Sequence, residues 1–243
     1  MSGSVALVTG GSRGIGAAGA LRLARDGYDV AITYVNDAQA AAEVVGKVEA
    51  LGRRALAVRA DAGDAAQAVA AVEETVRTLG RLDVLVNNAG VGVLGPLDGL
   101  GLADVDRVLA VNVRGTFLTA QAAAGRMGRG GRIITIGSCM TQRVPGPGGT
   151  LYAMSKAALT GLTKALAREL GERGITANIV HPGPVDTDMN PADGPYADPQ
   201  RAMTALGRYG APREVAAVVA FLAGEGAAYV TGAEFAVDGG HAA

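Results

Sequence analysis

Short runs of β-branched and apolar residues alternate along the whole chain with longer, alanine-rich stretches of helical period. This alternation predicts a parallel sheet whose strands are joined by crossover helices. Seven strands are predicted, at Val5–Thr9, Val30–Tyr34, Ala55–Arg59, Val84–Asn87, Arg132–Gly137, Thr176–His181 and Glu234–Val237. Six helices are predicted between them, near Ile15–Asp26, Ala38–Leu51, Ala65–Leu79, Leu102–Met127, Tyr152–Leu170 and Pro212–Gly224. Two architectures fit this pattern, an open doubly wound sheet and a closed eight-stranded barrel.

The predicted helices have recognisable starts, and no linker or internal repeat divides the chain. Asp37 and Asp64 suit N-cap positions, and Pro212 suits the first position of a helix. We therefore predict a single domain over residues 1–243. Residues 182–212 hold six of the nine prolines and little periodicity. A loop of this length is typical of a lid, here at about residues 184–211, although an inert surface excursion is the alternative.

Composition excludes several classes of protein. With 49% hydrophobic residues, the chain can bury a core, so intrinsic disorder is excluded. Its 22 basic and 23 acidic residues form no run, which argues against nucleic acid and membrane partners. The single cysteine, Cys139, cannot form an intrachain disulfide, and a small buried hydrophobe is favoured over a reactive thiol. The first residues lack a signal-peptide pattern, and the longest apolar run is too short for a bilayer span. We expect a cytoplasmic protein.

A glycine-rich turn, TGGSRGIG, follows the first predicted strand at residues 9–16. A turn this tight needs residues that tolerate positive φ, and a pyrophosphate can approach the backbone only where Cβ is absent. Gly10, Gly14 and Gly16 meet both needs, and the helix that follows presents free N–H groups to an anion. The spacing differs from the common G-x-G-x-x-G, and a plain strand-to-helix turn is the alternative. Its place after the first strand favours the doubly wound sheet and a dinucleotide site.

The end of the second strand bears on the choice of cofactor. Dinucleotide sites of this type often carry an acid there, to bind the ribose hydroxyls. Here Tyr34 ends the strand, Asn36 follows, and Asp37 is better explained as a helix cap. Arg13 in the glycine turn could instead pair with a 2′-phosphate, although a solvated turn residue is the alternative. These residues favour NADP(H), with NAD(H) as the second choice.

Tyr152 and Lys156 are four residues apart on a predicted helix, so the phenol and the ammonium are neighbours. When a carbonyl accepts a hydride, the resulting alkoxide must be protonated, and a phenol does this at neutral pH only if its anion is stabilised. A nearby ammonium provides that stabilisation. Ser138, after the fifth strand, could hold the carbonyl oxygen. The alternatives are an amphipathic helix face for the pair and a strand-terminating role for the serine.

Together these motifs resemble the short-chain dehydrogenase/reductase family over nearly the whole chain. The matching residues are Thr9 to Gly16, Asp61, Asn87 to Gly90, Asn112, Ser138, Tyr152, Lys156 and Pro182-Gly183. The resemblance implies a Rossmann fold and a single dinucleotide-binding and catalytic domain. It also implies an enzyme that transfers hydride between NADP(H) and a ketone or secondary alcohol, with 3-oxoacyl-[acyl-carrier-protein] reductases as the most similar members. A non-catalytic dinucleotide sensor on the same fold is the rival hypothesis.

The resemblance assigns roles to individual residues. Tyr152 would donate or accept the proton, Lys156 would bind the nicotinamide ribose, Ser138 would orient the carbonyl, and Asn112 would hold a water of the proton relay. The residues assigned to the cofactor are Gly10, Ser12, Arg13, Gly14, Ile15, Gly16, Tyr34, Asn36, Asp61, Ala62, Asn88, Ala89, Gly90, Tyr152, Lys156, Pro182, Gly183, Val185 and Thr187. No metal site is assigned.

One departure from the family pattern concerns the serine, which often precedes the tyrosine by thirteen residues. Here Cys139 is at that distance and Ser138 is one residue farther. Strand phasing favours Ser138, and a thiol donates weakly, so Cys139 is the second choice.

The resemblance also implies a homotetramer built through long helices. The lid residues Met189, Tyr196, Met203, Leu206 and Tyr209 suggest a mainly apolar wall for a small carbonyl or alcohol substrate.

Overall fold

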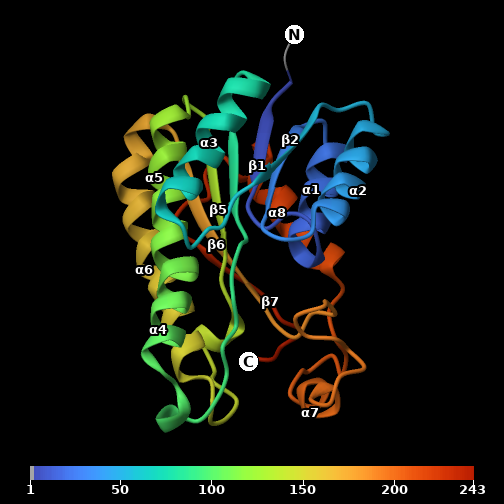
Figure 1. The fold of residues 1–243 in the computed structure, drawn as a ribbon, viewed down its shortest axis with the longest axis vertical. Helices are drawn as coiled ribbons and strands as arrows, with labels where there is room; N and C mark the ends of the chain where they lie inside the picture. The colour runs from blue at the N-terminus through green and yellow to red at the C-terminus, as the bar shows by residue number, and fades with distance from the viewer. Residues whose placement is uncertain (1–2) are drawn as a thin grey trace.

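The computed structural model describes residues 3–243, which form a seven-stranded sheet covered by helices (Figure 1). All strand pairs are parallel, in the order β3-β2-β1-β4-β5-β6-β7. The strands are β1 (Val5–Val8), β2 (Asp29–Tyr34), β3 (Ala55–Arg59), β4 (Val84–Asn87), β5 (Arg132–Ile136), β6 (Thr176–Pro182) and β7 (Glu234–Val237). The predicted open, doubly wound Rossmann sheet is confirmed, and the closed barrel is excluded.

Helices cover both faces of the sheet (Figure 1). One layer contains α1 (Gly14–Arg25), α2 (Ala38–Glu49) and α8 (Pro212–Ala223). The other contains α3 (Ala65–Leu79), α4 (Leu102–Val108), α5 (Thr116–Arg126) and α6 (Thr150–Leu170). A short helix, α7 (Ala197–Ala202), lies in the segment after β6. No helix within residues 3–243 is both long and apolar enough to span a bilayer.

Each face of the sheet has its own apolar core. Leu23 of α1 and Val44 of α2 pack with Ile32 on one side. Val72 of α3 packs with Leu85 and Ile133 on the other. Because β1, β2, β4, β5 and β6 are buried on both faces, their sequences read as nearly continuous apolar runs, and this made them visible in the sequence.

The predicted helix starts are confirmed. The Asp37 carboxylate accepts the Ala40 amide at 2.8 Å, and the Asp64 carboxylate accepts the amides of Ala66 and Gln67. Pro212 is the first residue of α8. Each cap satisfies backbone donors that the first turn of a helix would otherwise leave unpaired.

Two predictions of secondary structure need correction. The predicted helix Leu102–Met127 is divided into α4, a π-helical segment at Leu109–Gly115, and α5. The three segments follow one another with helical backbone angles at each junction. The spacing of apolar residues therefore does not distinguish the wider π-helical turns from an uninterrupted α-helix. The proline-rich segment after β6, which showed little periodicity, contains α7. This helix has six residues, which is too short to produce a periodic pattern.

Because all strands are parallel, their carboxyl ends share one edge of the sheet, at the bottom of Figure 1. Two lobes extend beyond that edge. Residues 91–101 after β4 form one lobe together with the loop after β5, which they meet at Gly95 and Gly148, and the predicted lid, with α7, forms the other (Figure 1). Ligands of open α/β sheets bind at this edge, where the strand order reverses.

Candidate active site

The glycine-rich turn after β1 has the backbone that its sequence predicted. Gly10 and Gly14 adopt φ of 62° and 54°, which disfavours any residue with a Cβ. A methyl group on Gly16 would crowd the Gly10 carbonyl oxygen and lie 2.5 Å from Nδ2 of Asn88. The turn therefore requires glycine at all three positions, two for conformation and one for space.

The first turn of α1 differs from those of α2 and α3. Its N-cap residue is Arg13, which has an extended backbone and makes no side-chain capping bond with any residue that the structure describes. The guanidinium of Arg13 instead lies 3.6 Å from the Asp188 carboxylate of the predicted lid, and both side chains are largely exposed. The backbone amides of Ser12 to Ile15 lie at this uncapped start of α1, where an anion would satisfy them.

Asn88 ties the end of β4 to this turn. Its side-chain amide donates to the carbonyl oxygens of Thr9 and Gly10 at 2.9 and 3.0 Å. The Thr9 hydroxyl accepts the amides of Asn88 and Ala89, both at 3.0 Å. These bonds fix the position where β1 and β4 meet and the strand order reverses.

Asp61 follows β3 and is held by two partners. Its carboxylate accepts the Gly63 amide at 2.8 Å and lies 2.9 Å from the Arg107 guanidinium of α4. Burial alone would raise the pKa of Asp61, but these two partners outweigh it and keep the pKa below its usual value. The neighbouring Ala62 carbonyl packs so closely against Gly115 that no side chain would fit at 115.

Tyr152, Lys156 and Ser138 converge at the carboxyl end of β5. The Lys156 ammonium lies 5.9 Å from the centre of the Tyr152 ring and donates to the Ile136 carbonyl oxygen at 3.0 Å. Burial lowers the pKa of Lys156 to about 8. Burial also raises the pKa of Tyr152, and hydrogen bonding to the Ser138 hydroxyl offsets part of that rise. The arrangement brings a phenol, an ammonium and a hydroxyl together in a poorly hydrated place.

Asn112 lies in the π-helical segment and is fully buried. Its side-chain amide donates to the Val91 carbonyl and to the Ser155 hydroxyl, and its oxygen accepts the Val91 amide, all at 2.9 Å. A methyl group on Gly90 would lie 3.2 Å from the Lys156 ammonium and 3.4 Å from Oδ1 of Asn112. Gly90 is therefore the point where Lys156 and Asn112 approach each other.

Cys139 is buried and free, and burial raises the pKa of its thiol to about 11. It is thus a neutral thiol at physiological pH. The neighbouring Ser138 is the residue whose hydroxyl interacts with Tyr152. The geometry favours Ser138 over Cys139 as the group that would hold a carbonyl oxygen.

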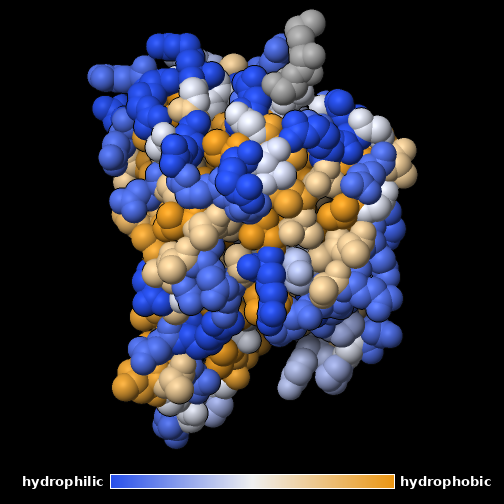
Figure 2. All heavy atoms as spheres, turned by 45° about the horizontal axis from the view of Figure 1, so that its top comes forward, coloured by the Kyte–Doolittle hydropathy of each residue, from blue (hydrophilic) through white to orange (hydrophobic). Residues whose placement is uncertain are grey.

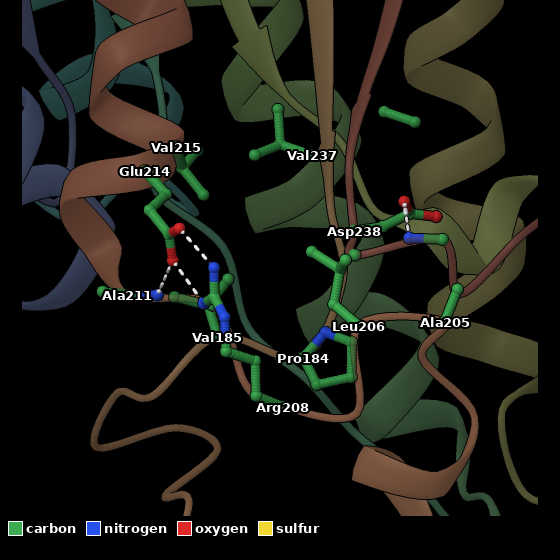
Figure 3. Close-up of a pocket in the computed structure, with 14 residues that line it drawn as sticks. Pro184, Val185, Ala205, Leu206, Arg208, Ala211, Glu214, Val215, Val237 and Asp238 are labelled. Carbon is green, nitrogen blue, oxygen red and sulfur yellow. Dashed lines mark hydrogen bonds and ion pairs between the residues drawn. The ribbon is translucent and has the colours of Figure 1, made fainter.

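The segment predicted to be a lid begins at the end of β6 and returns toward β7. Pro182 ends β6, a methyl group on Gly183 would lie 2.6 Å from Cα of Asp238, and Thr187 packs against Gly14. A cavity of about 420 Å³ lies where the lid returns, between α8 and the end of β7 (Figure 3). Arg208 and Glu214 form an ion pair at 2.7 Å at this cavity (Figure 3). Ser138 and Tyr152 are not among its lining residues, so it is separate from the Tyr152 site.

Apolar side chains are exposed on both lobes beyond the sheet edge. Leu94 and Leu97 are about seven-tenths exposed on one lobe, and Met189, Tyr196 and Leu206 are exposed on the lid. Figure 2 shows hydrophobic residues gathered on the lobe at its lower left. Of the five lid residues predicted to form an apolar wall for the substrate, Tyr209 and Met203 are less accessible, since Tyr209 is buried and Met203 is half-buried.

The structure adds residues that the sequence analysis missed. Arg107 holds Asp61, Asp188 pairs with Arg13, and His181 contacts the backbone of Ser138. Each pair joins different elements, so no sequence spacing could reveal it. Among residues 3–243, no group of three or more His, Cys, Asp or Glu side chains is placed to hold a metal ion.

Comparison with known proteins agrees with this geometry. The profile of a family described as enoyl-(acyl carrier protein) reductase matches residues 10–242. A cyclic-di-GMP-binding biofilm dispersal mediator protein of Escherichia coli is 44% identical over 98% of this chain and 97% of its own. A 3-oxoacyl-[acyl-carrier-protein] reductase of Synechocystis is 41% identical over 99% of this chain and 97% of its own.

The solved structures include one with the same arrangement over almost the whole chain. A short-chain dehydrogenase from Burkholderia cenocepacia, crystallised in complex with NADP, is 55% identical, covers 99% of this chain and 98% of its own, and has a TM-score of 0.98. Sequence, fold and the Ser138, Tyr152 and Lys156 cluster agree, and the chain belongs to the short-chain dehydrogenase/reductase family of oxidoreductases.

Proposed function

We propose that the protein is an NADP(H)-dependent carbonyl reductase or alcohol dehydrogenase acting on a ketone or the corresponding secondary alcohol. The observation that carries the proposal is the convergence of Tyr152, Lys156 and Ser138 beside the glycine turn at one edge of the sheet. A phenol next to a hydroxyl and an ammonium can move a proton to or from an oxygen held between them.

The residues around the turn fit a dinucleotide. Gly10, Gly14 and Gly16 leave the backbone bare, and the uncapped start of α1 offers amides to a pyrophosphate. When bound, the nicotinamide supplies or accepts the hydride. Arg13 is the candidate partner for a 2′-phosphate, and the Burkholderia cenocepacia relative was crystallised with NADP, so NADP(H) is the expected cofactor.

Each catalytic residue has one task in this proposal. Ser138 donates a hydrogen bond to the substrate oxygen, and Tyr152 gives that oxygen a proton during reduction or removes it during oxidation. Lys156 stabilises the tyrosinate and binds the cofactor's ribose, while Asn112 holds the loop at Val91 and the water of the proton relay. The pKa of Tyr152 is raised by burial, so the stabilising charge of Lys156 is needed for the phenol to act near neutral pH.

The central test is Tyr152→Phe, which removes the hydroxyl and keeps the ring. We expect NADPH binding, followed by cofactor fluorescence, to persist while turnover of NADPH with a panel of 3-oxoacyl thioesters, simple ketones and sugars is lost. A variant that keeps wild-type turnover would refute the proton-transfer role of Tyr152. The exposed Leu94, Leu97 and Leu206 favour apolar carbonyl substrates over sugars in this panel.

A second candidate function is a non-catalytic dinucleotide sensor on the same fold. One observation favours it, namely that a relative 44% identical over nearly the whole chain is named as a cyclic-di-GMP-binding protein. Absence of turnover over the whole panel, together with tight binding of cyclic-di-GMP in a calorimetric titration, would favour the sensor. Turnover that depends on Tyr152 would favour the enzyme.

We further propose a homotetramer in the cytoplasm. Phe117 on α5 and Met154 on α6 are about half exposed, and the small side chains of Ala157 and Ala158 on α6 are exposed as well. Such faces suit helix packing between subunits. The single free thiol, Cys139, suits a reducing compartment. Light scattering during size-exclusion chromatography tests the assembly.

A further inference from the structure

A buried histidine at the end of β6 lies between the backbone of Ser138 and a carboxylate of β7. Nδ1 of His181 is 3.2 Å from the Ser138 amide nitrogen and 3.0 Å from the Ser138 carbonyl oxygen. Nε2 of His181 is 3.2 Å from Oε2 of Glu234. The imidazole has no exposed surface, and it fits only because residue 137 is glycine, since a methyl group there would lie 2.8 Å from Cε1 of the ring.

The contact with Glu234 and the burial of the ring together favour the neutral imidazole with its hydrogen on Nε2. A carboxylate can only accept, so Nε2 of His181 carries a hydrogen toward Glu234. Burial lowers the pKa of His181, although Glu234 opposes this, so the ring is neutral at physiological pH. Nδ1 then accepts the Ser138 amide, while the Thr141 hydroxyl donates to the Ser138 carbonyl oxygen at 2.9 Å. Both backbone groups of Ser138 are satisfied in this arrangement.

Glu234 is itself fixed by α6, the helix that carries the predicted catalytic pair. The Lys164 ammonium lies 2.8 Å from Oε1 of Glu234, and the Thr160 hydroxyl donates to Oε2 at 3.4 Å. Thr160 and Lys164 follow Lys156 by one and two helical turns on the same face. Helix α6 therefore holds the end of β5 by two routes, directly through Lys156 and indirectly through Glu234 and His181.

We propose that the pair His181–Glu234 is a positioning element for Ser138, which fixes the backbone of this residue so that its hydroxyl, which accepts the Met140 amide at 3.2 Å, is directed at the substrate oxygen. This inference rests on the proposed function of Ser138. Strand β5 ends at Ile136, and Ser138 lies two residues beyond it. Residues 142–147, which follow Ser138, are exposed. The imidazole therefore contacts the Ser138 backbone a few residues before a solvent-exposed loop begins. His181 touches no reacting atom in this scheme.

A double-mutant cycle tests the proposal by steady-state turnover of NADPH with a carbonyl substrate found in the panel. We expect His181→Leu to lower kcat by about 10²-fold, as for a catalytic group displaced by about 1 Å, while the KM for NADPH is unchanged. In a Ser138→Ala background the same substitution should leave kcat unchanged, because no hydroxyl remains to be positioned. Equal losses of kcat in both backgrounds would overturn the inference. A Ser138→Ala variant with wild-type kcat would instead refute the proposed function.

Two pairs of variants separate positioning from folding. His181→Asn places an oxygen near the position of Nδ1, so it should accept the Ser138 amide and recover most of the kcat that His181→Leu loses. Glu234→Leu, on a partly exposed edge strand, removes the acceptor of Nε2–H and should lower kcat, whereas Glu234→Gln keeps an oxygen there and should retain it. These Glu234 variants carry the test if His181→Leu does not fold.

The matched control is Ile133→Ala in the core of β5, five residues before Ser138. It should reduce stability by about 2–5 kcal/mol without lowering kcat at a temperature where it remains folded. Far-UV circular dichroism verifies folding of every variant. Loss of kcat in His181→Asn as large as in His181→Leu, or wild-type kcat in Glu234→Leu, would contradict the positioning role.

Discussion

Gly16 and Gly19 lie on the same helix, α1, and the structure predicts opposite effects for the same substitution at the two positions. At Gly16 a new methyl group would lie 2.5 Å from Nδ2 of Asn88 and would also crowd the Gly10 carbonyl oxygen. At Gly19 the added carbon would have no atom of the described residues within 4 Å, apart from its chain neighbours and the adjacent helix backbone. Both positions have ordinary helical φ, so only the available space differs between them.

The magnitudes follow from these contacts. To accommodate Gly16→Ala, the Asn88 side chain must move by about 1 Å, although it is held by bonds of 2.9 and 3.0 Å to the Thr9 and Gly10 carbonyls. Overpacking costs about 1–3 kcal/mol, and weakening two hydrogen bonds costs about 1 kcal/mol each. The better helix propensity of alanine returns about 1 kcal/mol. We therefore expect Gly16→Ala to lower the free energy of unfolding by about 2–4 kcal/mol, and Gly19→Ala to raise it by up to about 1 kcal/mol.

Urea unfolding followed by far-UV circular dichroism measures both variants, since the chain has no tryptophan to report by fluorescence. Gly16→Ala should also weaken NADPH binding by at least about tenfold, because the phosphate-facing turn must change shape, whereas Gly19→Ala should bind as the wild type does. If Gly16→Ala were as stable as Gly19→Ala and bound NADPH equally well, the close packing of the turn would not be the reason for its glycine.

Three further predictions follow from the charged and titratable groups near the site. Burial lowers the pKa of Lys156 from 10.5 to about 8, so between these pH values the unfolded chain holds a proton that the folded chain lacks. The free energy of unfolding should therefore rise with pH across this window by up to about 3 kcal/mol. Urea midpoints measured over the same pH range should show this rise for the wild type and not for Lys156→Met. The Cys139 thiol, with its pKa raised to about 11, should react with a thiol reagent such as dithionitrobenzoate only after unfolding, and rapid labelling of the folded protein would contradict its burial. Arg13→Ala should weaken NADPH binding by about tenfold and leave NADH binding unchanged. Asp188→Ala, which removes the carboxylate that competes for Arg13, should weaken the binding of neither cofactor. Titration of cofactor fluorescence measures both affinities.

Much of the fold could be predicted because its central strands are buried on both faces and because α2 and α3 begin at aspartate caps. The strands Ala55–Arg59, Val84–Asn87 and Glu234–Val237 have the predicted bounds, and Asp64 caps α3 as its sequence position indicated. Such signals are local, since a run of apolar residues or an aspartate before a helix acts within a few positions of the chain. The wider turns around Asn112 produced no local signal and were missed.

The candidate site was predictable in outline for a different reason. Parallel strands bring their carboxyl ends to one edge, so Ser138 after β5 and Asn88 after β4 had to lie near the glycine turn. The contacts that hold the side chains of the candidate site in place could not be predicted from the sequence. His181 and Ser138 are 43 residues apart, and Arg107 and Asp61 are 46 apart, each pair joining elements whose relative rotation depends on packing throughout the core.

The uncapped start of α1 has a consequence for the protein's lifetime in a cell. Helices α2 and α3 begin on an aspartate of their own, but among the described residues no side chain does this for α1 at Arg13. An anionic ligand at those amides favours the native state by mass action, so resistance to proteolysis should increase with the concentration of free dinucleotide. The abundance of the protein would then follow the supply of its own cofactor.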